Sequence, residues 1–207
     1  MAPLDCRGAN PHALVMTSAA QTQDLTGKIL IAMPDMGDPR FHGSVVFLCA
    51  HSAEGAMGLI INKPMQDVHF AEMLEQLSIE RGPATPDLMV CYGGPVELRR
   101  GFVLHTADYH GALGDRLDVD DRFAMTATVD VLEDLARGTG PVAALLTLGY
   151  AGWGPGQLEQ EIAQNGWLTV DATTDLVFST PMEGKWVAAL ALLGVSPLTL
   201  SSQAGHA

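Results

Sequence analysis

Short apolar runs separated by turn residues constrain the fold of this chain more than any other feature. Residues 142–148, VAALLTL, are continuously apolar, which is typical of a central strand covered on both faces of a sheet. The runs at residues 44–51 and 57–62 flank a turn at Glu54-Gly55 and predict a β-hairpin. Further runs predict strands at residues 28–33, 87–92, 96–105, 122–126, 167–170 and 176–178.

Four stretches with helical spacing of apolar residues lie between these strands. Pro64 is expected to end the strand before it, because proline cannot donate to a ladder, and Asp67 to cap a helix that begins near Val68. The other helices are expected after Thr128 or Asp130, from Pro155, and over residues 183–193 with Trp186, Val187, Leu190 and Leu193 facing inward. Hairpins and strand–helix steps together predict an α/β (α+β) fold, in which helices surround a mixed sheet.

Composition limits the classes of partner. Apolar residues make up 47% of the 207 residues and charged residues 17%, so the chain can bury a sizeable core. Its formal net charge is -13, and Arg99-Arg100 is its only basic pair. Proteins that bind nucleic acids draw much of their affinity from Lys and Arg side chains that neutralise phosphates. We therefore expect no direct binding of DNA or RNA.

The N-terminal residues and the cysteines place further limits. Residues 1–24 are small and polar without an apolar period, so we expect a flexible tail followed by a single domain over residues 25–207. No apolar run reaches the roughly 18 residues that span a bilayer, and no signal peptide is evident. We therefore expect a cytoplasmic protein without a membrane segment. Cys6, Cys49 and Cys91 form no CxxC pair and are expected to be free thiols.

Several distinctive motifs follow one another along the chain. The strongest is LGYAGWGPGQLEQEI at residues 148–162; the others include residues 25–34, 55–64, 93–96, 100–105 and 165–168. In this order the motifs resemble the YqgE/AlgH family over about residues 25–207. The resemblance implies a single domain with a bifurcated, partly barrel-like mixed β-sheet. It also implies a regulatory association with exopolysaccharide (alginate) production, but no biochemical activity, so an enzyme is not the favoured interpretation.

The glycine-rich residues 149–156 lie between a predicted buried strand and a predicted helix, where phosphate-binding loops also occur. They lack the GxGxxG spacing, and no GK[ST] follows. We interpret the segment up to Glu161 as an architectural joint in which Trp153 packs. Gln157 and Glu161 share one helix face, and Glu161 is either a general acid–base or, as we favour, a solvated or structural carboxylate.

Two other groups of residues have a possible chemical reading. Cys49 and His51 are two apart on a strand and are expected on one side of the sheet, where an imidazole could activate the thiol. A buried structural cysteine is the favoured alternative. His105, Asp108 and His110 could meet a metal ion in a loop, but zinc needs three or four convergent ligands. We expect neither a metal nor a cofactor.

Two functional hypotheses follow. The first, which we favour, is a non-enzymatic regulatory protein that acts through a protein partner. The alternative is a small-ligand-binding protein or an enzyme, because glycine and polar residues at strand ends are common in binding sites. A pocket in which at least four candidates meet would favour the alternative. The candidate ligand-binding residues are His51, Asn62, Gly93, Gly94, His105, Trp153 and Gln157.

Overall fold

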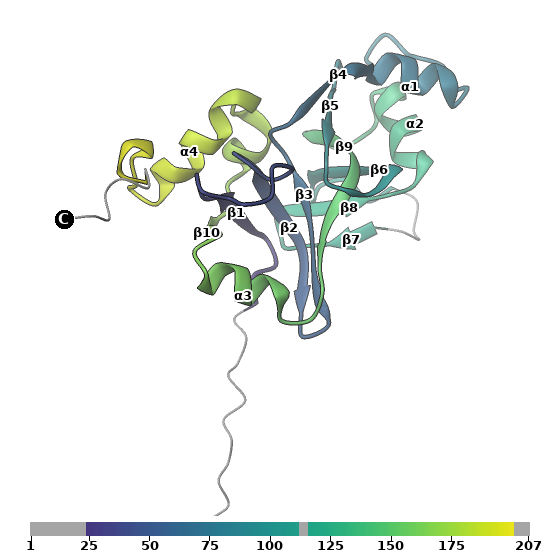
Figure 1. Cartoon of the computed structure of the whole chain (residues 1–207). Coiled ribbons are helices and arrows are strands. Elements are labelled where there is room, and N and C mark those ends of the chain that lie inside the picture. The colour runs from purple at the N-terminus through teal and green to yellow at the C-terminus, as the bar shows by residue number, and fades with distance from the viewer. Residues whose placement is uncertain (1–23, 112–115, 201–207) are drawn as a thin grey trace, which may run out of the picture.

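A computed structural model describes residues 24–111 and 116–200 (Figure 1). Within these residues ten strands form one sheet. The strands are β1 (Lys28–Ala32), β2 (Val45–Ser52), β3 (Gly55–Ile60), β4 (Pro64–His69), β5 (Met89–Tyr92), β6 (Val96–Thr106), β7 (Arg116–Asp118), β8 (Phe123–Thr126), β9 (Ala144–Trp153) and β10 (Trp167–Asp171). The helices are α1 (Phe70–Gln76), α2 (Val129–Arg137), α3 (Gln157–Ala163) and α4 (Lys185–Leu192), with a π-helical turn at Asp175–Ser179.

The sheet divides along β9. On one side of β9, β6 runs antiparallel from Gly101 opposite Leu148 onward. On the other side two strands share its length: β5 lies parallel to the first half, and β3 lies antiparallel to the second half. The complete path is β10-β1-β2-β3-β9-β6-β8-β7, and β4 and β5 branch from it. The bifurcated mixed sheet that the resemblance implies is therefore confirmed.

Glycines make this fork possible because two backbones approach closely there. A Cβ at Gly93 would lie 2.1 Å from the carbonyl oxygen of Gly149. A Cβ at Gly94 would lie 2.2 Å from the backbone carbon of Tyr150. Gly149 itself has φ +73°, in the left-handed region that residues with a Cβ rarely adopt. Residues 149–153 are thus the second half of β9, and our prediction that the segment 149–156 lies wholly between the strand and the helix was wrong.

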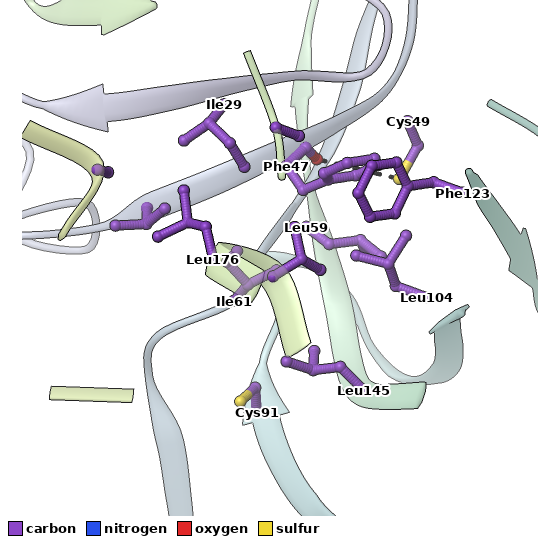
Figure 2. Close-up of a cluster of buried hydrophobic side chains, with 14 of the residues drawn as sticks. Ile29, Phe47, Cys49, Leu59, Ile61, Cys91, Leu104, Phe123, Leu145 and Leu176 are labelled. Atoms are coloured by element: carbon purple, nitrogen blue, oxygen red, sulfur yellow. Dashed lines mark hydrogen bonds between the residues drawn. The ribbon is translucent and has the colours of Figure 1, made fainter. Parts of the chain in front are cut away.

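Three apolar clusters hold the domain together. The largest packs Phe47, Leu59 and Phe123 of the sheet against Leu176 of the π-helical turn (Figure 2). It also contains Leu190 of α4. A second cluster, on the opposite face of β1 and β2, contains Leu158 of α3. In the third, α1 and α2 cover β5, β6 and β9. The first strands of the sheet are buried on both faces, which explains their continuous apolar runs.

Several local predictions differ from the structure. Residues 64–69 form β4, so α1 begins at Phe70 rather than near Val68, and Asp67 caps no helix. Pro64 is tolerated because β4 pairs only with β5. Residues 176–178 lie in the π-helical turn, whose carbonyl groups at Leu176 and Val177 accept hydrogen bonds from the buried Lys185. Strand β7 was not predicted, and Pro155 precedes α3 instead of opening it. Val187 and Leu193, which we expected to face inward, are exposed.

Two expectations concern residues outside the described ranges. The segment predicted to be a tail, with Cys6, lies almost entirely in residues 1–23, and the last seven residues of the predicted domain are also not described. Cys49 and Cys91 are buried free thiols. In the part of the chain that the structure describes, no helix is long and apolar enough to cross a membrane.

Candidate functional site

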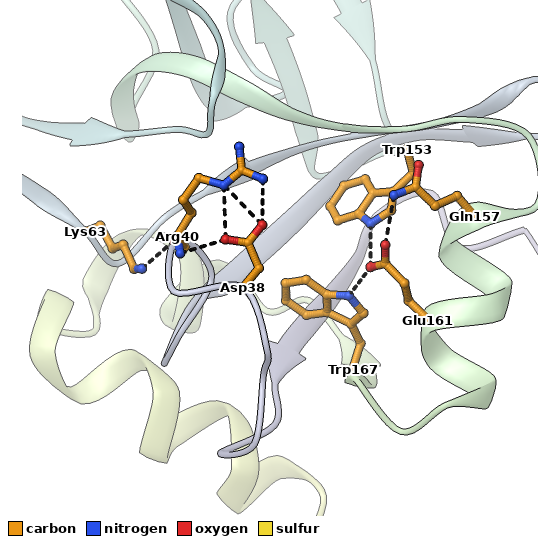
Figure 3. Close-up of polar contacts among 7 residues, drawn as sticks. All are labelled: Asp38, Arg40, Lys63, Trp153, Gln157, Glu161 and Trp167. Atoms are coloured by element: carbon orange, nitrogen blue, oxygen red, sulfur yellow. Dashed lines mark hydrogen bonds and ion pairs between the residues drawn. The ribbon is translucent and has the colours of Figure 1, made fainter.

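The glycine-rich motif ends in a cleft of about 650 Å³ whose walls carry two tryptophans, Trp153 at the end of β9 and Trp167 at the start of β10. One carboxylate oxygen of Glu161 on α3 accepts both indole N–H groups, at 3.0 Å from Trp153 and 2.8 Å from Trp167 (Figure 3). We call this site the tryptophan cleft. The Glu161 carboxylate thus joins the ends of two strands to one helix.

Gln157 completes the contacts of Glu161. Its side-chain amide N–H donates to the other carboxylate oxygen of Glu161 at 2.9 Å, and its carbonyl oxygen accepts the Gly154 backbone N–H at 3.0 Å. Across the cleft, Arg40 forms an ion pair with Asp38 at 2.6 Å (Figure 3). The hydrogen bond from Arg40 lowers the pKa of Asp38, so this carboxylate stays charged. With three donors on Glu161, these contacts favour the architectural interpretation over a general base.

His51 and Asn62 fasten loops to strands. The Nδ1 atom of His51 accepts the Leu25 backbone N–H at 3.1 Å, and its Nε2–H donates to Glu159 at 2.9 Å. Asn62 accepts the Val45 backbone N–H and donates to the Gly43 carbonyl, both at 2.8 Å. Each side chain has its hydrogen-bonding groups engaged within the protein.

His105 is buried in β6, where its ring packs edge-on against Tyr109. Its Nδ1–H donates to the Thr106 carbonyl at 2.8 Å, and its Nε2 accepts the Thr126 hydroxyl at 3.0 Å. Burial lowers the pKa of His105, which keeps the ring neutral. Nowhere in residues 24–111 and 116–200 do three metal-ligating side chains come together.

The seven predicted residues therefore do not line a single cavity. Trp153 and Gln157 share the tryptophan cleft. Gly93 and Gly94 lie at the fork of the sheet. His51, Asn62 and His105 each form hydrogen bonds at a different place in the fold. The predicted alignment of Cys49 with His51 was also wrong. A β-bulge between Leu48 and Ala50 breaks the alternation of side chains between the two faces of the sheet. Cys49 therefore lies in the largest apolar cluster, whereas the His51 side chain forms a hydrogen bond with Glu159 of α3.

Sequence reasoning missed an apolar groove of about 580 Å³ between α1, β6 and α2. Its rim exposes Leu77, Leu98 and Val129, with 44%, 54% and 46% of their surface accessible. Leu98 lies in a four-residue bulge of β6, between Val96 opposite Tyr150 and Gly101 opposite Leu148. In the sequence, the one indication of this groove is the apolar Leu98 next to the only basic pair of the chain. The alternation of apolar and polar residues in the predicted strand does not indicate a bulge.

The fold defines a single-domain mixed α/β protein with a curled, forked sheet, and comparison with known proteins identifies its family. Residues 29–198 match the family described as AlgH-like. A UPF0301 protein of Jannaschia sp. (strain CCS1) is 62% identical over 186 residues, which cover 90% of this chain and 97% of that protein. A UPF0301 protein of Ruegeria pomeroyi is 60% identical over 185 residues, with 89% and 100% covered. The chain belongs to the AlgH-like family.

Solved structures agree with this assignment. The solution structure of the AlgH protein from Pseudomonas aeruginosa matches with a TM-score of 0.72 and 43% sequence identity, covering 91% of this chain and 98% of that chain. A protein from Corynebacterium diphtheriae matches with a TM-score of 0.65 at 23% identity, covering 85% and 89%. The second match supports the fold alone.

Proposed function

We propose that this protein acts without catalysis, in a regulatory role, by binding an amphipathic helix of a partner protein in the groove between α1, β6 and α2. The observation that carries the proposal is the exposure of Leu77, Leu98 and Val129 around one apolar groove. Apolar helix faces bind such grooves through residues spaced three or four apart. Exposed apolar surface that gathers in one place is also typical of interaction sites.

Charge favours a particular kind of helix. Arg99 and Arg100 lie on the β6 rim, whereas Asp67 and Glu72 lie on the rim formed by β4 and α1. In a chain of net charge -13, this basic pair is the place where an acidic partner meets the least repulsion. A helix with an apolar stripe and acidic residues along the edge that faces Arg99 and Arg100 complements the groove. Such rim charges act mainly on the rate and specificity of association.

Site-specific photo-crosslinking in cells tests the proposal. A photoreactive amino acid replaces Leu98 or Val129 in separate variants, and the control places it at Val187, which is exposed on α4. We expect a partner adduct from positions 98 and 129 that is absent at 187 and is lost when Leu77→Asp is added. Mass spectrometry should locate the adduct in an amphipathic, acidic helical segment.

Three outcomes would contradict the proposal. Equal labelling at positions 98 and 187 would show that the groove is not preferred. Labelling that survives Leu77→Asp would show that its apolar wall is not used. A crosslink between two copies of this chain would show that the groove mediates self-association and does not bind a partner protein.

A further inference from the structure

A third hollow, of about 820 Å³, lies within the curl of the sheet. Five strands that are neighbours in the sheet line it with apolar side chains, among them Met57 of β3, Tyr150 of β9, Phe102 of β6, Met125 of β8 and Leu117 of β7. Leu117 and Met125 face each other directly across the β7–β8 pair. We call this site the sheet hollow.

The sheet hollow is the open end of the largest apolar cluster. Phe102 and Met125 belong to the cluster, and Met57, Leu117 and Tyr150 pack against it while remaining partly accessible. Tyr150 lies over Gly152, where an added Cβ would be 3.3 Å from its ring. Concave apolar surface at the open mouth of a curled sheet is a common place for small ligands, and the volume is within their usual range of about 300–1,000 Å³.

Arg100 is the polar group best placed to orient a ligand. Its guanidinium carbon lies 5.2 Å from the centre of the Phe102 ring, and one of its terminal N–H groups donates to Glu97 at 3.2 Å. Within the described residues, the structure gives the remaining N–H groups of Arg100 no acceptor. The ion pair with Glu97 is exposed, with 52% and 47% of the two side chains accessible, so it contributes little and can be exchanged.

The other charged groups of the sheet hollow have different roles. Arg116 also lines it, but its guanidinium is held by Asp118, by the Tyr109 carbonyl and by His110. Arg116 therefore supplies positive charge rather than free donors. Glu54 and Glu97 line the same hollow, so the two arginines balance them. A hollow without net charge is a favourable place for an anion in a protein of net charge -13.

We propose that the sheet hollow binds a small amphipathic anion, whose aromatic or aliphatic body lies on Met57, Leu117 and Tyr150 and whose carboxylate pairs with Arg100. On binding, the ligand carboxylate takes the place of Glu97 as the partner of the guanidinium. Arginine and a carboxylate can form two parallel hydrogen bonds, which fix the direction of the ligand as well as its charge. This site is separate from the groove that receives the proposed partner helix, although Arg100 borders both.

Titration with 4-phenylbutyrate, followed by amide NMR shifts of the full chain, tests this proposal. We expect shifts that concentrate on β3, β6, β8 and the second half of β9. Arg100→Gln should weaken binding about tenfold, the usual scale for a lost charge-assisted contact of about 1.4 kcal/mol. Arg99→Gln is the matched control, since Arg99 lies outside the sheet hollow. Glu97→Gln should strengthen binding severalfold, because it removes the competing carboxylate.

Arg100→Gln and Glu97→Gln are expected to change the affinity in opposite directions, so a general loss of folding cannot explain both results. Equal affinities of the Arg100→Gln and Arg99→Gln proteins would overturn the role of Arg100. Equal binding of 4-phenylbutylamine would overturn the preference for an anion. Shifts confined to α1 and α2 would place the ligand in the groove instead and would refute the site.

Discussion

Removal of the Glu161 carboxylate tests how the end of β9 is held. In Glu161→Ala, the indole N–H groups of Trp153 and Trp167 lose their acceptor. Both tryptophans are buried, with 6% and 2% of their surface accessible. A hydrogen bond to a charged group contributes about 1.5–3 kcal/mol, and a buried donor without a partner is costly. Because Glu161 is only partly buried, water can replace part of the loss, and we expect the variant to unfold about 2–3 kcal/mol more easily.

Urea unfolding followed by far-ultraviolet circular dichroism measures this change without relying on the emission of the altered tryptophans. Gln160→Ala is the matched control, since Gln160 is exposed on the same helix. Gln157→Ala should cost about 1 kcal/mol or less, as exposed helix positions do. Glu161→Gln keeps one carbonyl oxygen as an acceptor, so its free energy of unfolding should fall between those of Glu161→Ala and the wild type. The reasoning fails if Glu161→Ala and Gln160→Ala unfold at the same urea concentration.

The remaining predictions concern buried groups. Trp153→Ala should cost roughly 3–5 kcal/mol in urea unfolding, and a variant as stable as the wild type would refute the architectural role of this ring. Burial lowers the pKa of Lys185 to about 8, so at higher pH the unfolded chain keeps a proton that the folded protein releases. Between pH 7 and 9 the wild type should therefore gain about 1 kcal/mol over Lys185→Met, and parallel stability curves would contradict this. Burial also raises the pKa of Cys91 to about 11, and Cys49 is fully enclosed; neither thiol should react with a disulfide reagent until the protein unfolds, so rapid native labelling would disprove their enclosure.

The strands of the first half were predictable because burial on both faces leaves a simple signal. Phe47 and Leu48 point to opposite clusters and are both fully buried. A run of apolar residues there can only be a covered strand or a buried helix, and the short connection to residues 57–62 selects the strand. Pairing of β2 with β3 follows from the same turn.

Elements with weaker periodicity were predicted less well. Residues 64–69 form an edge strand that is partly exposed, so no run of apolar residues marks it. Leu176 and Val177 look like a strand because both are buried side by side. Their π-helical turn depends on Lys185, nine and eight residues away, whose ammonium group binds their carbonyl oxygens. A contact of that kind leaves no local pattern in the sequence.

The motifs were informative about architecture for a physical reason. Gly93, Gly94 and Gly149 are required where strands cross closely at the fork, and His51 and Asn62 satisfy backbone groups where loops meet strands. Side chains whose polar atoms are already engaged in this way have few free donors for a ligand. Exposed apolar positions and arginines with free N–H groups retain that capacity. Leu98 and Arg100, which no spacing rule singled out as a site, are therefore stronger candidates for recognition than the glycine-rich motif that defines the fold.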